Sequence, residues 1–566
     1  MMKKRILAAT LSFVLTLTLL LTACGQKNSN DASSPSPSQT SNQEDLNPFG
    51  KYENPVEVTA CRVLASWMGF DEGENENNNW WTKTYLEQLG VKLNVVWTAP
   101  NWGEPLDQKI ATSIATDDLP DLIPVYGSLA MRLIQAGKTG DIKDVYEKYA
   151  SEELKSLMER NNGIPLKNST YDGKMFGLAN PGADLDAGLV WIRKDWLEKL
   201  NLPVPTSWQE IENVASEFIV KEAGGKGTYG IAMDKDLKYV SRFANAFGAY
   251  AIGYTCWVEK DGKLEYGEIQ PEVKQPLKVL SDWYNRGIIA KDFATKDENN
   301  ELGADIASGK VGIVFAGKHF PNSGHARALK KNNPEAEWIF VPMMAYDGGN
   351  IKHYQPSKSG DFIVVNAKAK HPEAIIKMVN LWTAIFGPNK PDFVQGNEYD
   401  TTKGGNMNFW NSVIVFGFGY PGKDWMSAQA VREELKKEGD GSSLRASDRP
   451  LFEQLNSWNK NGTNAENFEV NWAMHKLFGF GGSFEYVNDV LGAELNNFYF
   501  DKFYGLDTPA MSKYGGEWAT KAKEYYIRAI MNGKVDEEFD AWVKYFNLNG
   551  GEKATQEVNE WYNKNR

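Results

Sequence analysis

The feature that most constrains the fold of this chain is a regular alternation of short apolar runs with amphipathic stretches, which begins at Val56. VEVTACRVL (56–64) and VKLNVVW (91–97) are rich in β-branched residues and are typical of buried strands. Between them, WWTKTYLEQLG (80–90) has apolar residues at helical spacing and ends at Gly90, a common helix stop. Such alternation predicts an α/β protein in which helices cover a mostly parallel sheet.

The same alternation continues along most of the chain. Ser207 and Glu210 form a capping-box pattern behind Pro205, which predicts that a helix begins there. From about Pro388 strand patterns become scarce, and the chain ends in helical patterns. The further strand patterns are at 121–126, 188–192, 228–233, 310–315, 337–344 and 361–367, and the main further helical patterns are at 106–116, 193–202, 205–225, 271–287, 371–387, 518–533, 535–546 and 557–565.

The first 53 residues have the layout of an export leader followed by a linker. A basic start, an apolar run and then a polar stretch rich in Ser, Asn and Pro are typical of a secretory signal, although a retained N-terminal helix is an alternative. Leu21-Thr22-Ala23-Cys24 resembles the bacterial lipoprotein box, in which the cysteine becomes a lipid-bearing N-terminus. We therefore expect residues 1–23 to be a signal peptide and 24–53 a lipidated flexible linker. An ordinary signal peptide with an incidental cysteine is the other interpretation.

Length, charge and cysteine content limit the number of domains, the kind of partner and the disulfides of this chain. At 566 residues the chain is long enough for two or more domains. The net charge is -12, and removal of the leader takes away three basic side chains and no acidic one, which argues against a nucleic-acid partner. Cys61 and Cys256 could form at most one disulfide, and two buried free thiols are the favoured interpretation.

No motif for enzyme chemistry stands out. GFGYPG (417–422) has glycine spacing typical of dinucleotide-binding loops, but Pro421 interrupts it. We expect no helix to begin at its last glycine, and no strand pattern follows to complete a βαβ unit. The five histidines lack metal-ligand spacing, and no nucleophile-elbow motif is present. We therefore predict no cofactor, metal site or catalytic residue. A glycosidase carboxylate pair is set by geometry rather than by spacing, so a lipid-anchored glycan hydrolase stays as an alternative.

Landmarks spread over nearly the whole chain after the linker resemble the extracellular solute-binding proteins of carbohydrate ABC importers. They are closest to the long Gram-positive lipoprotein branch described as oligosaccharide- or aldouronate-binding. The landmarks are LGVKLNVVW, DDLPDLIPVY, YDGKMFGL, LVWIRKDWLEKLNLPVPTSWQEI, ASGKVGIVFAG, DFIVVNAKAKHPE and YYIRAIMNGKVDEEFDAWVKYFNLNGGEKATQEVNEWY.

The resemblance implies a two-lobed, periplasmic-binding-protein-like (type II) α/β fold with a hinge and an interlobe cleft. Lobe one would comprise residues 54–178 plus about 336–366, and lobe two 179–335 plus about 367–566. The chain would cross between the lobes near 171–182, 316–324 and 355–362, where Gly, Pro and Ser are frequent. Cys61 and Cys256 would then lie in opposite lobes.

The resemblance also implies a function. We expect an oligosaccharide ligand, ABC permease subunits as partners, attachment to the outer face of a Gram-positive-type cell membrane through the lipid on Cys24, and a monomer. A peptide-binding receptor is a further alternative, although we see no pair of charged groups placed to hold both peptide termini.

Candidate ligand-binding residues lie where strands of the predicted sheets end, because ligands of open α/β sheets bind outside the carboxyl ends of the strands. Aromatic faces stack on sugar rings, and planar polar side chains bind sugar hydroxyls. An acidic sugar would need a cation, which Arg193 or Arg242 could supply. The candidates are Trp67, Asp71, Asn78, Trp102, Tyr126, Asp184, Asp186, Arg242, His319, Phe320 and Trp410.

Overall fold

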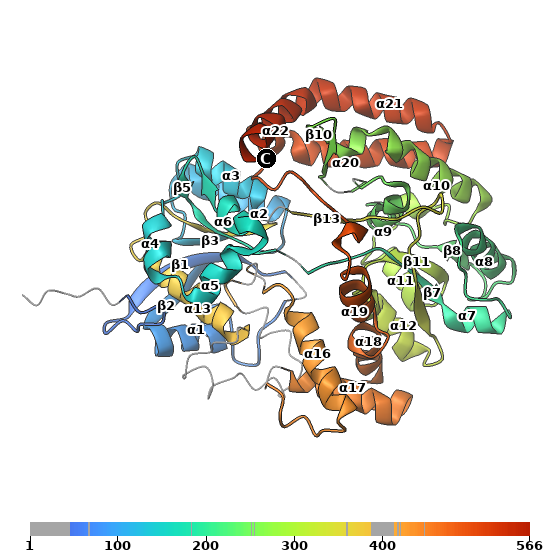
Figure 1. The fold of residues 1–566 in the computed structure, drawn as a ribbon, viewed down its shortest axis with the longest axis horizontal. Coiled ribbons are helices and arrows are strands. Elements are labelled where there is room, and N and C mark those ends of the chain that lie inside the picture. Colours follow the sequence, from blue (N-terminus) through green and yellow to red (C-terminus); the bar gives the residue numbers. More distant parts are fainter. Residues whose placement is uncertain are drawn as a thin grey trace, which may run out of the picture. The chain divides into compact units, whose positions relative to one another are not determined.

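The computed structural model describes residues 46–566, except for 66–67, 183, 251, 254, 358–359, 387–412, 416–417, 419 and 446–447. Leu46–Arg566 form one compact unit. Most of its strands lie in two separate sheets, each covered by helices (Figure 1). The leader and Cys24 lie outside the described residues.

A five-stranded sheet, in the order β2-β1-β3-β14-β6, forms the centre of the first lobe. β1, β2 and β3 run parallel, and β14 runs antiparallel to β3 and to β6, so the carboxyl ends of β1, β3 and β6 lie at one edge. Two apolar clusters fill the space between the sheet and its helices. The elements of this lobe are β1 Val56–Val63, β2 Val91–Ala99, β3 Leu122–Tyr126, β6 Gly177–Ala179, β14 Asp361–Val365, α1 Trp80–Thr84, α2 Glu104–Thr116, α3 Gly127–Gln135, α4 Lys143–Tyr149, α5 Glu152–Met158, α6 Arg160–Asn168 and α13 Pro372–Phe386, with the small pair β4 Thr170–Tyr171 and β5 Lys174–Met175.

A four-stranded sheet, in the order β12-β7-β11-β8, forms the centre of the second lobe. β8 and β11 run parallel, and β7 runs antiparallel to β11, so β7 begins at the edge where β11 ends. The connection from β6 to β7 therefore links the carboxyl edges of the two sheets. The elements of this lobe are β7 Leu189–Arg193, β8 Tyr229–Ile231, β11 Val311–Ala316, β12 Trp338–Pro342, α7 Lys194–Lys199, α8 Trp208–Val220, α9 Lys238–Phe243, α10 Lys274–Arg286, α11 Glu301–Ala307 and α12 Gly324–Asn332, with the hairpin β9 Trp257–Lys260 and β10 Lys263–Tyr266.

The C-terminal third adds helices to the second lobe. Figure 1 shows α20 and α22 beside α10 and β10, and their apolar faces share one core with the four-stranded sheet. A smaller apolar cluster joins α16, α17, α18 and α19. The elements are α16 Lys423–Lys436, α17 Arg449–Asn461, α18 Phe468–Phe478, α19 Ser483–Glu485, α20 Pro509–Asn532, α21 Val535–Phe546 and α22 Glu552–Asn565, with β15 Phe498–Phe500 pairing with β13 His353–Gln355.

Buried polar side chains of α13 fix the start of the described chain to the first lobe. Lys377 Nζ donates to the carbonyl of Gly50 at 2.8 Å and lies 4.6 Å from the ring of Tyr52. Asn380 Nδ2 donates to the carbonyl of Pro48 at 3.0 Å. Because Lys377 and Asn380 are almost fully buried, these bonds hold the segment that follows the linker against the first lobe.

Three details of the predicted layout are wrong. β12, in the segment that we expected to return to lobe one, pairs with β7 in the second sheet. α13, which we expected in lobe two, packs in the first core, where Trp382 contacts Trp81. The crossing expected near 316–324 is absent, because β11 and α12 share one apolar cluster. Alternation shows that strands and helices form, but it does not say which sheet each strand joins.

Two further expectations have clear outcomes. Cys61 and Cys256 are both buried and unbonded, as predicted. α16 begins directly after Gly422, so the expectation that no helix begins at that glycine is wrong. Among the described residues the next strand is β15, which pairs only with β13.

Within the described part of the chain, we find no helix that combines the length and apolar character needed to cross a membrane.

Candidate functional site: two cavities at the connected sheet edges

A cavity of about 300 Å³ opens at the carboxyl edge of the first sheet. Arg62 and Val63 line it at the end of β1, Pro124 and Val125 in β3, and Asp361 at the start of β14. Trp102, which follows β2, and Asn180, which follows β6, complete its polar and aromatic wall. Its other lining residues are Met68, Phe362, Ile363, Val413 and Ile414. Apolar walls with a few convergent polar groups are typical of small-molecule sites.

The two ionisable groups that line this cavity are partly or fully removed from water. Arg62 is 5% exposed, and burial lowers the pKa of its guanidinium to about 10, only partly offset by the charge of Glu76. Burial also raises the pKa of Asp361. The Arg62 side chain lies over the ring of Phe70 at 5.6 Å, and its Nε donates to the carbonyl of Val63 at 3.4 Å. The cavity thus offers a cation, a carboxyl group, an amide and an indole to a ligand.

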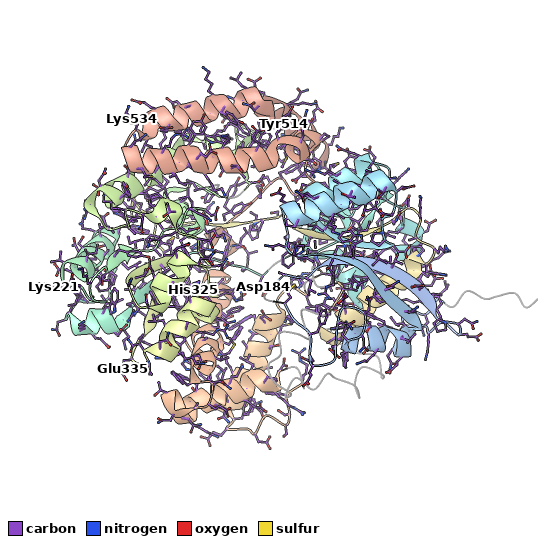
Figure 2. The ribbon with its side chains drawn as sticks, turned by 180° about the vertical axis from the view of Figure 1, so that it is seen from behind. Asp184, Lys221, His325, Glu335, Tyr514 and Lys534 are labelled. Atoms are coloured by element: carbon purple, nitrogen blue, oxygen red, sulfur yellow. The ribbon has the colours of Figure 1, made fainter. Side chains whose placement is uncertain are left out.

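A second cavity, of about 320 Å³, lies beyond the carboxyl ends of β8 and β11 in the second lobe. His319 is exposed, and its ring meets that of Phe484 edge-on at 4.9 Å. Tyr239 Oη lies 3.3 Å from His325 Nε2, and Figure 2 labels His325 at the start of α12. The cavity is lined by Tyr239, Glu298, Ala316, His319, Phe320, Asn322, Ser323 and His325.

A cluster of charged groups holds the connection between the two sheets in place. Asp186 Oδ2 accepts a 2.6 Å hydrogen bond from Arg242, and Asp186 Oδ1 accepts from the backbone of Lys318 at 3.3 Å. Although burial opposes ionisation, the charges of Arg242 and Lys318 keep the pKa of Asp186 below its ordinary value. Asp184, labelled in Figure 2 on the same connection, accepts from the backbone of Gly422. These two aspartates therefore bind other parts of the chain.

The remaining predicted site residues fall into three groups. Trp102, His319 and Phe320 line one of the two cavities, although Phe320 is 5% exposed and packs mainly against Trp191 and Trp338. Asn78, Asp71 and Tyr126 do not line either cavity. Trp67 and Trp410 lie outside the described residues.

Local contacts explain where two of these side chains point. Asn78 Nδ2 donates to the carbonyl of Gly73 at 3.3 Å, so it braces its own loop. Tyr126 donates its hydroxyl to Asp107 on α2. Asn78 therefore holds the loop after β1, and Tyr126 links the end of β3 to α2.

Sequence reasoning missed several cavity residues. Arg62 interrupts the apolar strand pattern 56–64 and Asp361 begins the pattern 361–367, so a charged side chain within or at the start of an apolar run was a usable signal. Asn180, Tyr239 and His325 had no such signal, because only the folded chain brings them to the cavities.

In the described part of the chain, no group of three or more His, Cys, Asp or Glu side chains is placed to hold a metal ion.

The geometry defines a class of protein: a two-lobed α/β binding protein with a cavity at the carboxyl edge of each sheet. Comparison with known proteins agrees with this class. Residues 77–384 match the bacterial extracellular solute-binding protein family, and the chain belongs to that family.

Two relatives illustrate the range of the similarity. The chain is 26% identical over 262 residues to the polygalacturonan/rhamnogalacturonan-binding protein YtcQ of Bacillus subtilis, covering 45% of this chain and 50% of YtcQ. It is 25% identical over 248 residues to the fructooligosaccharide ABC transporter substrate-binding protein FusA of Streptococcus pneumoniae, covering 40% of this chain and 44% of FusA. The chain thus matches about half the length of these curated relatives.

Solved structures share the fold over nearly the whole chain. The alginate-binding protein AlgQ2 superposes with a TM-score of 0.60 at 16% identity, covering 91% of this chain and 99% of AlgQ2. The two-lobed fold predicted from the sequence is therefore confirmed.

Proposed function

We propose that this protein captures an oligosaccharide between its two lobes and delivers it to the membrane subunits of an ABC importer. The observation that carries the proposal is that the two cavities lie at sheet edges joined by one connection, from β6 to β7. A chain of sugar rings that reached from one cavity to the other would contact both lobes. Contacts of that kind favour a closed form, because only interactions absent from the open form shift the equilibrium.

The chemistry of the cavities supports a sugar ligand. An exposed indole at Trp102 offers a flat apolar face, and Asn180 and Asp361 offer planar polar groups for hydroxyls. The relatives YtcQ and FusA are named for oligosaccharide or polysaccharide ligands, and the name of FusA places it in an ABC transporter.

We also propose that the protein is a monomer held at the outer face of the membrane by lipid on Cys24. The lipoprotein-box pattern and similarity to the Bacillus subtilis lipoprotein LipO support the anchor. Labelling of cells with a radioactive or clickable palmitate, followed by comparison with a Cys24→Ala variant, tests it.

A thermal-shift screen of the purified folded body against neutral and uronic-acid oligosaccharides tests the main proposal. A ligand that binds only the folded state raises the melting temperature in proportion to the logarithm of its concentration above Kd. At about 100 times Kd the added stability is about 2.7 kcal/mol. If no oligosaccharide raised the melting temperature while peptides did, a peptide receptor would replace this proposal. Chromatography of the same mixtures tests the hydrolase alternative, because an enzyme would release shorter products at catalytic turnover.

A further inference from the structure

Three connections pass from one lobe to the other among the residues that the structure describes. The first runs from β6 to β7, and the second runs from β12 to β14 through β13. The third precedes α16: Tyr420 donates its hydroxyl to Glu153 of the first lobe at 2.7 Å, whereas α16 packs with α17, α18 and α19. Trp472 of α18 lies in the same apolar cluster as β11, so this group of helices belongs to the second lobe. A change in the angle between the lobes therefore bends all three connections.

Hydrogen bonds join the first connection to the other two. The backbone N–H of Asp186 donates to Gln355 Oε1 at 3.3 Å, and Gln355 Nε2 donates to the carbonyl of Asp186, so the first connection is bonded twice to β13. Gln355 is buried, and its amide group is satisfied by these bonds. Asp184 accepts from the backbone of Gly422 in the third connection. The three connections therefore form one hydrogen-bonded unit.

Lys318, which follows β11, lies where these connections meet. It is 1% exposed, and its Nζ donates to the carbonyl of Leu185 in the first connection at 2.6 Å and lies 4.2 Å from the centre of the Phe484 ring. Its backbone N–H donates to Asp186 at 3.3 Å. Its carbonyl accepts from Ser483 Oγ of α19 at 2.7 Å. Lys318 thus contacts both the first connection and the group of helices that follows the third.

The charge of Lys318 acts on two of the connections. Burial lowers the pKa of its ammonium group, and the charges of Asp184, Asp186 and Asp424 oppose that shift. Asp184 and Asp186 belong to the first connection, whereas Asp424 lies in the first turn of α16, directly after the third. A buried charge is costly, and an apolar side chain of similar volume often stabilises a fold as well or better. What the cation adds here is an attraction that draws carboxylates of separate connections to one place.

We infer that Lys318 and Asp186 are positioning residues that couple the three connections, so that the lobes move as two rigid bodies about a single hinge. The inference rests on the proposed function, in which the lobes close on an oligosaccharide, and names residues that control this motion. Neither residue lines either cavity. Connections without these bonds would bend separately, and the ligand-free protein would sample many angles between the lobes. Coupling limits that freedom before binding, which reduces the entropy lost on closure.

Double electron–electron resonance measures the distribution of distances between two spin labels, one on each lobe, in the ligand-free protein. The labels are attached to Lys92→Cys on β2 and Glu198→Cys on α7, because each of these side chains is 66% exposed. Cys24→Ser removes one of the three native thiols, and the other two, Cys61 and Cys256, are buried. The labels therefore report on the two lobes alone.

The wild-type hinge should give one narrow distribution of distances. Lys318→Met keeps the apolar stem but removes the buried charge, and Asp186→Asn weakens the bonds to Arg242 and to the backbone of Lys318. We expect each change to widen the distribution about two-fold, because the connections can then bend separately.

Lys330→Met is the matched control, because Lys330 is a buried lysine of the second lobe whose bonds stay within that lobe. It is 4% exposed, its Nζ donates to the carbonyl of Ala336 at 3.0 Å and contacts Glu337 at 3.1 Å, and it lies 5.6 Å from the centre of the Trp472 ring. Its replacement should lower the melting temperature and leave the distribution of distances unchanged. A general loss of stability would instead affect both lysine variants alike.

Gln355→Leu keeps the inference testable if neither charge variant folds. It removes the paired hydrogen bonds between the first two connections without changing a charge, and it should widen the distribution by a smaller amount. Each variant is first checked for native circular dichroism.

The outcomes separate the inference from the proposed function. Wider distributions in every folded variant of Lys318, Asp186 and Gln355, together with an unchanged one in Lys330→Met, support the inference. A broad wild-type distribution, an unchanged distribution in any folded hinge variant, or equal widening in Lys330→Met overturns it, while the oligosaccharide receptor stands. Absence of binding by every oligosaccharide in the thermal-shift screen overturns the proposed function, but it does not alter these distributions, which are measured without ligand.

Discussion

Glu268 offers a sharp test of the packing that joins the C-terminal helices to the second lobe. Its backbone carbonyl accepts hydrogen bonds from Tyr526 of α20 at 2.7 Å and from Trp542 of α21 at 3.0 Å. Its side chain is buried, with one oxygen accepting from the backbone of Gly253 at 3.0 Å and the other contacting Tyr266 Oη at 3.1 Å. Burial raises the pKa of Glu268 to about 8, despite these hydrogen bonds.

The raised pKa makes the stability of the protein depend on pH. Between pH 4.5, the ordinary pKa of the side chain, and about 8, the folded state holds a proton that the unfolded state has lost. The contribution of Glu268 to the free energy of unfolding is therefore complete below pH 4.5 and declines as the pH rises to about 8. At 1.36 kcal/mol per pH unit, the total decline is about 5 kcal/mol.

Glu268→Gln keeps the shape and the neutral charge of the protonated side chain, so this decline should disappear. The difference in free energy of unfolding between the variant and the wild type should grow in favour of the variant by up to about 4 kcal/mol between pH 5 and pH 8, three pH units at 1.36 kcal/mol each. Guanidinium unfolding, followed by both fluorescence and circular dichroism to check for a single transition, measures it.

A neighbouring carboxylate provides the matched control for Glu268. Glu272 pairs with Lys260 at 2.9 Å, and although partial burial opposes it, this pairing lowers the pKa of Glu272. The difference between Glu272→Gln and the wild type should therefore be flat between pH 6 and pH 8. A Glu268→Gln difference that is equally flat would refute a buried, protonated Glu268.

Three further predictions follow from particular contacts. Trp102→Ala should weaken oligosaccharide binding by about 10-fold in calorimetry, because the indole lines the cavity. The melting temperature should stay nearly unchanged, because Trp102 is 38% exposed. Wild-type affinity of the variant would show that Trp102 does not contact the ligand. Lys377→Met should lower the free energy of unfolding by about 1–3 kcal/mol and speed proteolysis around residue 50, because the hydrogen bond to the carbonyl of Gly50 is lost. An unchanged cleavage rate would contradict the role of α13 in holding that segment. Cys61 and Cys256 should react with Ellman's reagent only after denaturation, because burial raises the pKa of both thiols; rapid reaction of the native protein would contradict their burial.

The sequence predicts the elements of the fold better than their assembly. The apolar runs at β1, β2, β3, β7 and β11 and the helix stop at Gly90 follow from local chemistry, and Gly90 adopts the left-handed conformation expected of a helix end. The positions of β12 and α13 were assigned to the wrong lobes, because strand pairing depends on contacts between distant residues. The lobe of any segment that returns to a sheet formed earlier in the chain is hard to predict for the same reason.

The residues of the candidate site were predictable only where an aromatic ring or a histidine follows the end of a strand. Trp102 and His319 follow strands and line the cavities. Asp186 was a reasonable candidate by position, but its carboxylate binds Arg242, a partner 56 residues away that spacing does not reveal. Arg62 was not among the candidates, although a charged side chain interrupts the apolar strand pattern there, and the folded chain buries it at the cavity wall.

Small-angle X-ray scattering of the folded body, with and without a saturating oligosaccharide from the thermal-shift screen, tests the central claim most directly. If the ligand contacts both lobes, its binding should favour the closed form and reduce the radius of gyration. Saturation by an oligosaccharide with no change in the scattering curve would contradict capture between two moving lobes.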